Sequence, residues 1–187
     1  MFINPKNHYN TMKTLSYFSL VLVFLFAMGE TTNAQERYSR REKKAHYNSD
    51  YNYDVQIMGV GQDGTKVMKV SGHGKRVEDA VIEAKMNAVA SVIFKGIPGG
   101  HGAATTPPIL KDSNAGDKHA EYFETFFSPG GKYLQFITMT TDGMPSGQDR
   151  LKMKKGYKVF IYAQVMYDAL RKQLENDGIA RSLDSGF

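Results

Sequence analysis

The residues best suited to chemistry lie where a predicted strand runs into a predicted helix. Gly72, His73 and Gly74 are followed by two cations, Lys75 and Arg76, which open the helix. Backbone amides and cations at a helix N-terminus are a common anion-binding arrangement. A dinucleotide-binding turn needs a third glycine, which this stretch lacks. We therefore interpret the glycine pair as a sharp turn that lets the helix lie close to the sheet, with anion binding as the alternative.

Histidine is the other residue type that could carry catalysis or hold a metal. None of the histidines after the N-terminal segment stands at the i, i+3 or i+4 spacing of a helical metal site. The chain has no Cys, which excludes thiolate nucleophiles and Cys-based metal sites, and it contains no serine-hydrolase motif. We expect no catalytic residue, cofactor or metal. The candidate ligand-binding residues are His73, Lys75, Arg76 and His101.

An apolar segment near the N-terminus predicts export. Lys13 precedes a charge-free run from Leu15 to Met28, which is short for a membrane-spanning helix of roughly twenty residues. A small-residue cleavage pattern ends at Ala34. We expect residues 1–34 to hold a signal peptide that is cleaved after Ala34. Met12 is the expected natural start of translation, which would leave residues 1–11 untranslated. The expected location is the periplasm or outer envelope, and an uncleaved anchor is the alternative.

Basic residues are concentrated in two clusters, at 37–44 and 150–158, in a chain of net charge +5. Such clusters can track nucleic acid or anionic lipid. Because export is expected, we expect no nucleic-acid partner, and peripheral membrane association is the partner class that the clusters leave open. A solvated charged face is the simpler interpretation. Residues 35–50 are polar and without period, typical of a flexible leader, and residues 181–187 form a polar tail.

The first elements of the folded part are a hairpin and a long helix. Short β-type runs at 53–61 and 65–72 flank Asp63-Gly64, a strong hairpin signal. Residues 75–95 then show helical spacing, with one stripe built around Ala80, Ala84 and Ala88 and a second around Ile82, Met86, Val89 and Ile93. A helix that is apolar on two sides needs cover from more than one layer.

The remaining elements define the fold class. A short helix is expected over 118–128 and long β runs over 132–143 and 154–167. A final helix is expected with Asp168 as its N-cap and its end at Gly178. Grouped hairpins favour an antiparallel sheet over alternating β-α units. We predict one α+β domain over residues 51–180, with two hairpins forming the sheet and the long and C-terminal helices on one face. The predicted order is β-β-α-(α)-β-β-α.

The segment 96–118 is rich in Gly and Pro and has no periodicity. Loops of this length in a compact domain are usually functional or disordered. Ordering each residue costs roughly 1–2 kcal/mol of backbone entropy, and the segment has few apolar residues to offset that cost. We expect it to be mobile in the isolated protein, unless it orders against a partner or over the second helix stripe at Met86 and Ile93.

Two stretches carry a resemblance to a known family. "GHGKRVEDAVIEAKMNAV", followed later by "GYKVFIYAQVMYDAL", resembles the N-terminal domain of the flagellar assembly protein FlgT and related small bacterial envelope proteins. The resemblance implies a non-catalytic envelope domain used in assembly or interaction, and it does not imply a flagellar role. The matching positions are Gly72, Gly74, Ala80, Ala84, Ala88, Tyr157, Val159, Ile161, Ala163 and Val165.

Two functions of different class follow. The first is an exported, non-catalytic envelope protein that acts in assembly or protein–protein interaction, as an accessory subunit of a larger cell-envelope complex, with envelope proteins as partners. The alternative is a small-molecule or glycan binding domain, or an enzyme, with its site between the 96–118 loop and His73. A flat apolar face or an open sheet edge favours the first, and a concave pocket lined by His73, His101 and aromatic residues favours the second.

Overall fold

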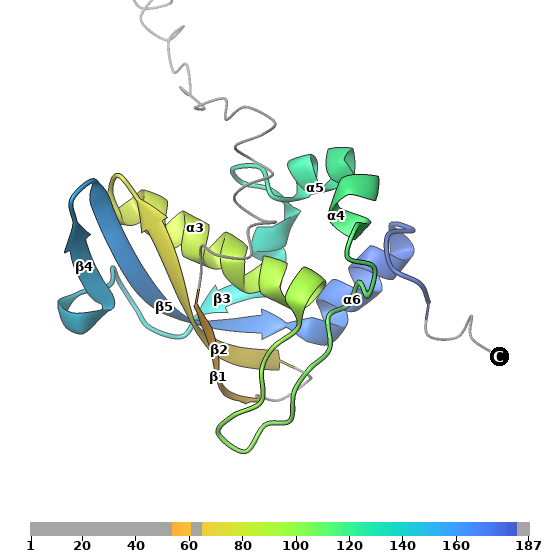
Figure 1. Cartoon of the computed structure of the whole chain (residues 1–187), viewed down its shortest axis with the longest axis horizontal. Coiled ribbons are helices and arrows are strands. Elements are labelled where there is room, and N and C mark those ends of the chain that lie inside the picture. Colours follow the sequence, from red (N-terminus) through yellow and green to blue (C-terminus); the bar gives the residue numbers. More distant parts are fainter. Residues whose placement is uncertain (1–53, 61–64, 183–187) are drawn as a thin grey trace, which may run out of the picture. The chain divides into compact units, whose positions relative to one another are not determined.

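The computed structural model describes residues 54–60 and 65–182, which combine an antiparallel sheet with helices, so the predicted α+β class is confirmed (Figure 1). The predicted signal peptide, the basic leader and the first hairpin turn lie outside the described residues, as does most of the polar tail.

The sheet centres on its longest strand, β5 (Gly156–Met166). Strand β2 (Thr65–Gly74) pairs with β5 on one side, and β1 (Val55–Val60) pairs with the outer side of β2, as the predicted hairpin requires. Two short strands, β3 (Ile137–Met139) and β4 (Arg150–Met153), both pair with the other side of β5. β3 meets the C-terminal part of β5 and β4 meets its N-terminal part.

The residues of β5 alternate strictly between two faces. Val159 lies directly opposite Gly72 on β2, so the two residues point to the same side of the sheet. On that side every second residue of β5 is fully buried: Val159, Ile161, Ala163 and Val165. The residues between them are only partly buried: Lys158, Phe160, Tyr162 and Gln164.

The buried side of the sheet is covered by α3 (Val77–Ala90), which packs on β2 and β5. The approach is so close that a Cβ on Gly72 would lie 2.2 Å from the Ala80 carbonyl oxygen and 2.4 Å from the Ala84 amide nitrogen. A Cβ on Gly74 would lie 2.4 Å from the Ala80 amide nitrogen. The glycine pair therefore serves helix–sheet packing, as the sequence indicated.

The predicted second stripe of this helix is only partly correct. Val89 and Ile93 are fully buried, whereas Ile82 is 47% exposed on the outer side. The helix also changes its winding near its end, because Ser91–Lys95 form a π-helical turn in which the Gly96 amide donates to the Ser91 carbonyl at 2.8 Å.

The 96–118 segment is anchored to the end of that helix. Ile97 pairs with Thr106 across a short hairpin. The Ile109 amide then donates to the Val92 carbonyl at 3.1 Å, and the Leu110 amide donates to the Ile93 carbonyl at 2.9 Å. These bonds satisfy carbonyls that a helix end leaves without partners. The segment thus orders over the second helix stripe at Ile93, the alternative given above.

The short helix predicted over 118–128 corresponds to α5 (Ala120–Phe126), and a single helical turn, α4 (Ala115–Lys118), precedes it within the stretch predicted as a loop. The 3-10 turn η3 (Lys132–Phe136) follows. The predicted β run over 132–143 is wrong in its first half, because η3 replaces it. Tyr133 and Phe136 stand three residues apart, which suits a 3-10 turn, and both are buried against the rings of Phe127 and Phe126. Burial of these rings outweighs the β propensity of the run.

The second hairpin is also different from the predicted one. After the three residues of β3, the chain passes through the 3-10 turn η4 (Gly147–Asp149) into β4. A two-residue turn, Lys154-Lys155, then joins β4 to β5. The hairpin partner of β5 along the chain is therefore the short β4, not the predicted 132–143 run.

Helix α6 (Tyr167–Asn176) starts where β5 ends, so Asp168 lies in its first turn and is not its N-cap. The helix ends at Gly178 as predicted, with a left-handed φ of 71°. The buried Leu170 and Leu174 join the same core as α3. The hydroxyl of Tyr122 on α5 donates to Asp177 at 2.6 Å, which ties α5 to the end of α6.

Candidate functional site

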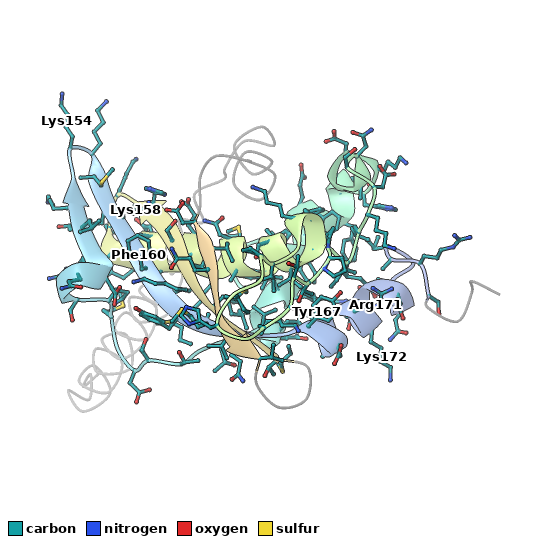
Figure 2. The ribbon with its side chains drawn as sticks, turned by 60° about the horizontal axis from the view of Figure 1, so that its bottom comes forward. Lys154, Lys158, Phe160, Tyr167, Arg171 and Lys172 are labelled. Atoms are coloured by element: carbon teal, nitrogen blue, oxygen red, sulfur yellow. The ribbon has the colours of Figure 1, made fainter. Side chains whose placement is uncertain are left out.

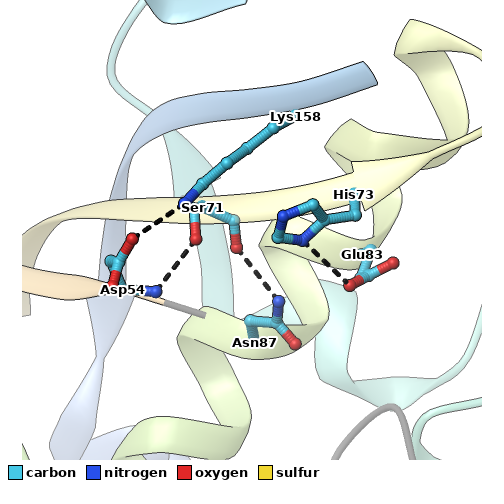
Figure 3. Close-up of polar contacts among 6 residues, drawn as sticks. All are labelled: Asp54, Ser71, His73, Glu83, Asn87 and Lys158. Atoms are coloured by element: carbon cyan, nitrogen blue, oxygen red, sulfur yellow. Dashed lines mark hydrogen bonds and ion pairs between the residues drawn. The ribbon is translucent and has the colours of Figure 1, made fainter. Parts of the chain in front are cut away.

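Strand β2 extends beyond the described part of β1. Two side chains of α3 form hydrogen bonds with backbone groups on this outer edge of β2 (Figure 3). Asn87 Nδ2 donates to the Ser71 carbonyl at 3.0 Å, and Glu83 accepts a hydrogen bond from the His73 backbone amide. Glu83 and Asn87 stand at i and i+4, so they reach the strand from one side of the helix. Among the described residues, these backbone groups of the strand end are thereby paired by side chains of α3.

The Glu83 carboxyl is an unusual group for this position, because its side chain is only 13% exposed. Burial raises its pKa to about 7. The His73 Nδ1 atom lies 3.9 Å from Glu83 Oε1, but burial and the positive charge of Lys158 lower the pKa of His73. Both shifts favour the neutral forms, so near neutral pH the contact is not a full ion pair.

The opposite side of the sheet from α3 carries a row of cations and aromatic rings. Lys69 Nζ lies 5.0 Å from the ring centre of Phe160 and 5.1 Å from that of Tyr162. Asp149 holds this ammonium group from the other side at 3.1 Å. The hydrogen bonds with Tyr162 and Asp149 raise the pKa of Lys69. Lys69 is therefore a fixed cation lying across two aromatic side chains.

The row continues toward the end of β2. Lys158 Nζ lies 5.2 Å from the Phe160 ring centre and pairs with Asp54 Oδ2 at 2.9 Å. The Asp54 amide in turn donates to Ser71 Oγ at 2.9 Å. Figure 2 shows Lys158 and Phe160 near each other on β5.

We call this side of the sheet the open face. It is formed by β1, β2 and β5, and no described α-helix lies across it, because α3 packs on the other side. A hollow of about 210 Å³ opens on it, lined by Asp54, Gln56, Lys69 and Phe160. The hollow is smaller than a typical small-molecule pocket of about 300–1,000 Å³. The open face consists of Gln56, Lys69, His73, Lys158, Phe160, Tyr162 and Gln164.

The four residues predicted as a binding site do not come together. Arg76 donates to Asp79 at 2.8 Å within the first turn of α3, and Lys75 is exposed in the turn before it. His101 is exposed at the tip of the 97–106 hairpin, where its φ is 49°. Of the four, only His73 lies on the open face.

The separation of the two histidines follows from the strand register. A Cβ on Gly100 would lie 3.0 Å from Ile57, which pairs with Met68 on β2. His73 is five residues farther along β2, roughly 16 Å away at the rise of a strand. Figure 1 shows the loop and the β2–α3 turn at different ends of the sheet. The predicted pocket between the 96–118 loop and His73 is therefore not formed.

Sequence reasoning did not single out the residues of the open face, because it did not separate the two sides of β5. The signal was the alternation of Lys158, Phe160 and Tyr162 with small and β-branched residues. Such alternation is typical of a strand with one buried side and one exposed side. The contribution of Lys69 could not be read in the same way, since it depends on the register between β2 and β5.

Comparison with known proteins finds no matching family model, no matching curated protein and no matching solved structure. Within residues 54–60 and 65–182, no helix is long and apolar enough to cross a membrane. The same residues contain no group of three or more His, Asp or Glu side chains arranged to hold a metal ion.

Proposed function

We propose that this chain is an exported, non-catalytic protein of the cell envelope that binds a protein partner through its open face. In this role it is an accessory subunit of a larger assembly. Export rests on the apolar run and the cleavage pattern before Gln35. The interaction role rests on the sheet, one side of which is buried under α3 while the other carries partly exposed aromatic rings.

The observation that carries the proposal is the pairing of rings and fixed cations on the side of the sheet that no described α-helix covers. Phe160 and Tyr162 are adjacent on one side of β5, and Lys69 and Lys158 are held over them by Asp149 and Asp54. Protein interfaces are enriched in aromatic residues, which supply large contact area at low entropic cost. Because carboxylates already orient the cations, less side-chain entropy is lost when a partner binds to this surface.

The resemblance to the FlgT N-terminal domain supports the same class of function through the fold. Its matching positions on α3 and on the buried side of β5 form the helix–sheet contact. Four of them are fully buried: Ala80, Ala84, Ala88 and Val159. These positions describe how the domain packs, and none of them belongs to the open face, because Tyr157 lies on the same side of β5 as Val159. The partner would thus be specific to this chain.

The test is affinity purification from native cell envelopes. The wild type is compared with the double variant Phe160→Ser/Tyr162→Ser and with Ile82→Ser, which removes an apolar side chain that is 47% exposed on α3. We expect the partner proteins to be lost at least tenfold from the double variant and retained by Ile82→Ser. The intact mass of the purified chain should correspond to a start at Gln35.

Two results would contradict the proposal. Equal recovery of every partner by the double variant, with unchanged melting temperature, would show that the interaction surface lies elsewhere. A full-length chain found in the cytoplasm would contradict the proposed export to the cell envelope.

A further inference from the structure

The β4–β5 hairpin, residues 150–158, carries more positive charge than any other described segment of its length. It contains five basic residues and no acidic one. All four residues of β4 are exposed, as are both residues of the turn. Figure 2 shows the turn, with Lys154 at its tip, projecting from the end of the sheet. The basic residues are Arg150, Lys152, Lys154, Lys155 and Lys158.

Most of this charge is not neutralised within the described part of the protein. Only Lys158 of the hairpin faces a carboxylate, that of Asp54. Lys152 instead donates to the Tyr157 hydroxyl at 3.1 Å, with its Nζ 4.6 Å from the ring centre. Elsewhere in the described residues, carboxylates pair with the basic side chains of Lys69, Arg76, Lys118, Lys132 and Arg171.

Exposed apolar side chains lie between these cations. Leu151 is 44% exposed and Met153 is 45% exposed. Leu151 lies opposite Lys158, and Met153 lies opposite Gly156, so both apolar side chains point to the same side of the hairpin. Arg150 and Lys152 alternate with them on the other side.

We propose that this hairpin docks on a membrane surface that carries anionic lipid headgroups. Unpaired cations are attracted to such a surface, each strengthening binding by about fivefold. Leu151 and Met153 supply the apolar contribution, since binding at a membrane surface strengthens with buried apolar area as well as with attraction to anionic lipid. The inference goes beyond the proposed partner binding, which uses the rings farther along β5.

The arrangement of the hairpin favours lipid over nucleic acid. Sequence-tolerant binding of single strands depends on aromatic rings on which bases stack. The nearest ring on the open face, that of Phe160, has the ammonium groups of Lys69 and Lys158 about 5 Å from its centre, each held by a carboxylate. The ring within the hairpin, that of Tyr157, is partly buried and has Lys152 Nζ 4.6 Å from its centre. The most exposed uncharged side chains of the hairpin, Leu151 and Met153, are aliphatic, which suits the boundary between headgroups and acyl chains.

The test measures vesicle co-sedimentation of the protein as isolated from cells. Vesicles of phosphatidylethanolamine and phosphatidylglycerol are compared with vesicles of phosphatidylcholine alone. We expect binding to the anionic vesicles, at least tenfold weaker for Lys154→Glu/Lys155→Glu and severalfold weaker for Leu151→Ser/Met153→Ser. The matched control, Lys111→Glu/Lys172→Glu, makes the same change in net charge at exposed positions outside the hairpin and should bind as the wild type does.

Several outcomes would overturn the inference. Equal losses in the hairpin and control pairs would show that only net charge matters. Undiminished binding by both hairpin variants would place the contact elsewhere. Tighter hairpin-dependent binding to a single-stranded oligonucleotide than to anionic vesicles would assign the cations to nucleic acid. All of these results are independent of partner recovery through Phe160 and Tyr162. If the hairpin does not bind anionic lipid, the proposed protein interaction is still tested separately by that recovery.

Discussion

Replacing Gly72 with alanine should lower the free energy of unfolding by about 3 kcal/mol or more. The new Cβ would lie 2.2 Å from the Ala80 carbonyl oxygen and 2.4 Å from the Ala84 amide nitrogen. Both are backbone atoms of α3, so the whole helix would have to move away from the sheet. Overpacking of a tight contact typically costs about 1–3 kcal/mol. We expect a cost at the upper end of this range or above it, because the new Cβ on β2 would clash with backbone atoms of α3.

The measurement is chemical denaturation of Gly72→Ala beside His73→Ala. The control alters the neighbouring residue, whose side chain is partly exposed on the other side of β2, and should cost no more than about 1 kcal/mol. Equal midpoints for Gly72→Ala and the wild type would show that α3 does not lie against β2 at this distance. Anion binding by the turn would then need to be considered again.

Replacing Glu83 with glutamine should stabilise the protein at alkaline pH and leave it nearly unchanged in acid. Burial raises the pKa of Glu83 from 4.5 to about 7 in the folded state. The neutral carboxyl is therefore favoured by folding, and its stabilising effect is fully present below pH 4.5. That effect is lost as the pH rises through about 7. At about 1.4 kcal/mol per pH unit, the raised pKa corresponds to about 3 kcal/mol at pH 8.

Glutamine keeps the neutral shape and an oxygen that can accept from the His73 amide, so it avoids the cost of ionisation. We expect Glu83→Gln to be more stable than the wild type by about 2 kcal/mol at pH 8 and equal to it near pH 4.5. His73 titrates in the opposite sense, because its pKa is lowered and its protonation destabilises the fold in acid. Its contribution is the same in both proteins. Parallel stability curves across this range would refute the raised pKa.

The sequence predicted the parts of the fold that depend on local pattern. The alanine stripe of α3, the glycine pair before it and the Gly178 stop each follow from short-range rules, and each lies where expected. The run at 132–143 failed because β propensity is weaker than the burial of Tyr133 and Phe136 against other rings. No window of the sequence shows those rings to be neighbours.

The candidate site was harder to predict, because its residues are assembled by register. His73, Lys75 and Arg76 are neighbours in sequence, yet the strand and the capping contact with Asp79 direct them to different surroundings. Lys69 and Phe160 are distant in sequence and meet only because β2 and β5 pair. The ordering of the 96–118 segment could not be decided from the sequence for a related reason, since the carbonyls that anchor it belong to the end of α3.

The central claim is that the open face meets a protein partner in the envelope. A photo-crosslinking amino acid placed at Tyr162 tests it in living cells, with the same amino acid at Ile82 as the control on the outer side of α3. We predict that position 162 gives a discrete crosslinked species containing a protein recovered by affinity purification, and that position 82 gives none. Crosslinks from position 82 to that protein, with none from position 162, would contradict the claim.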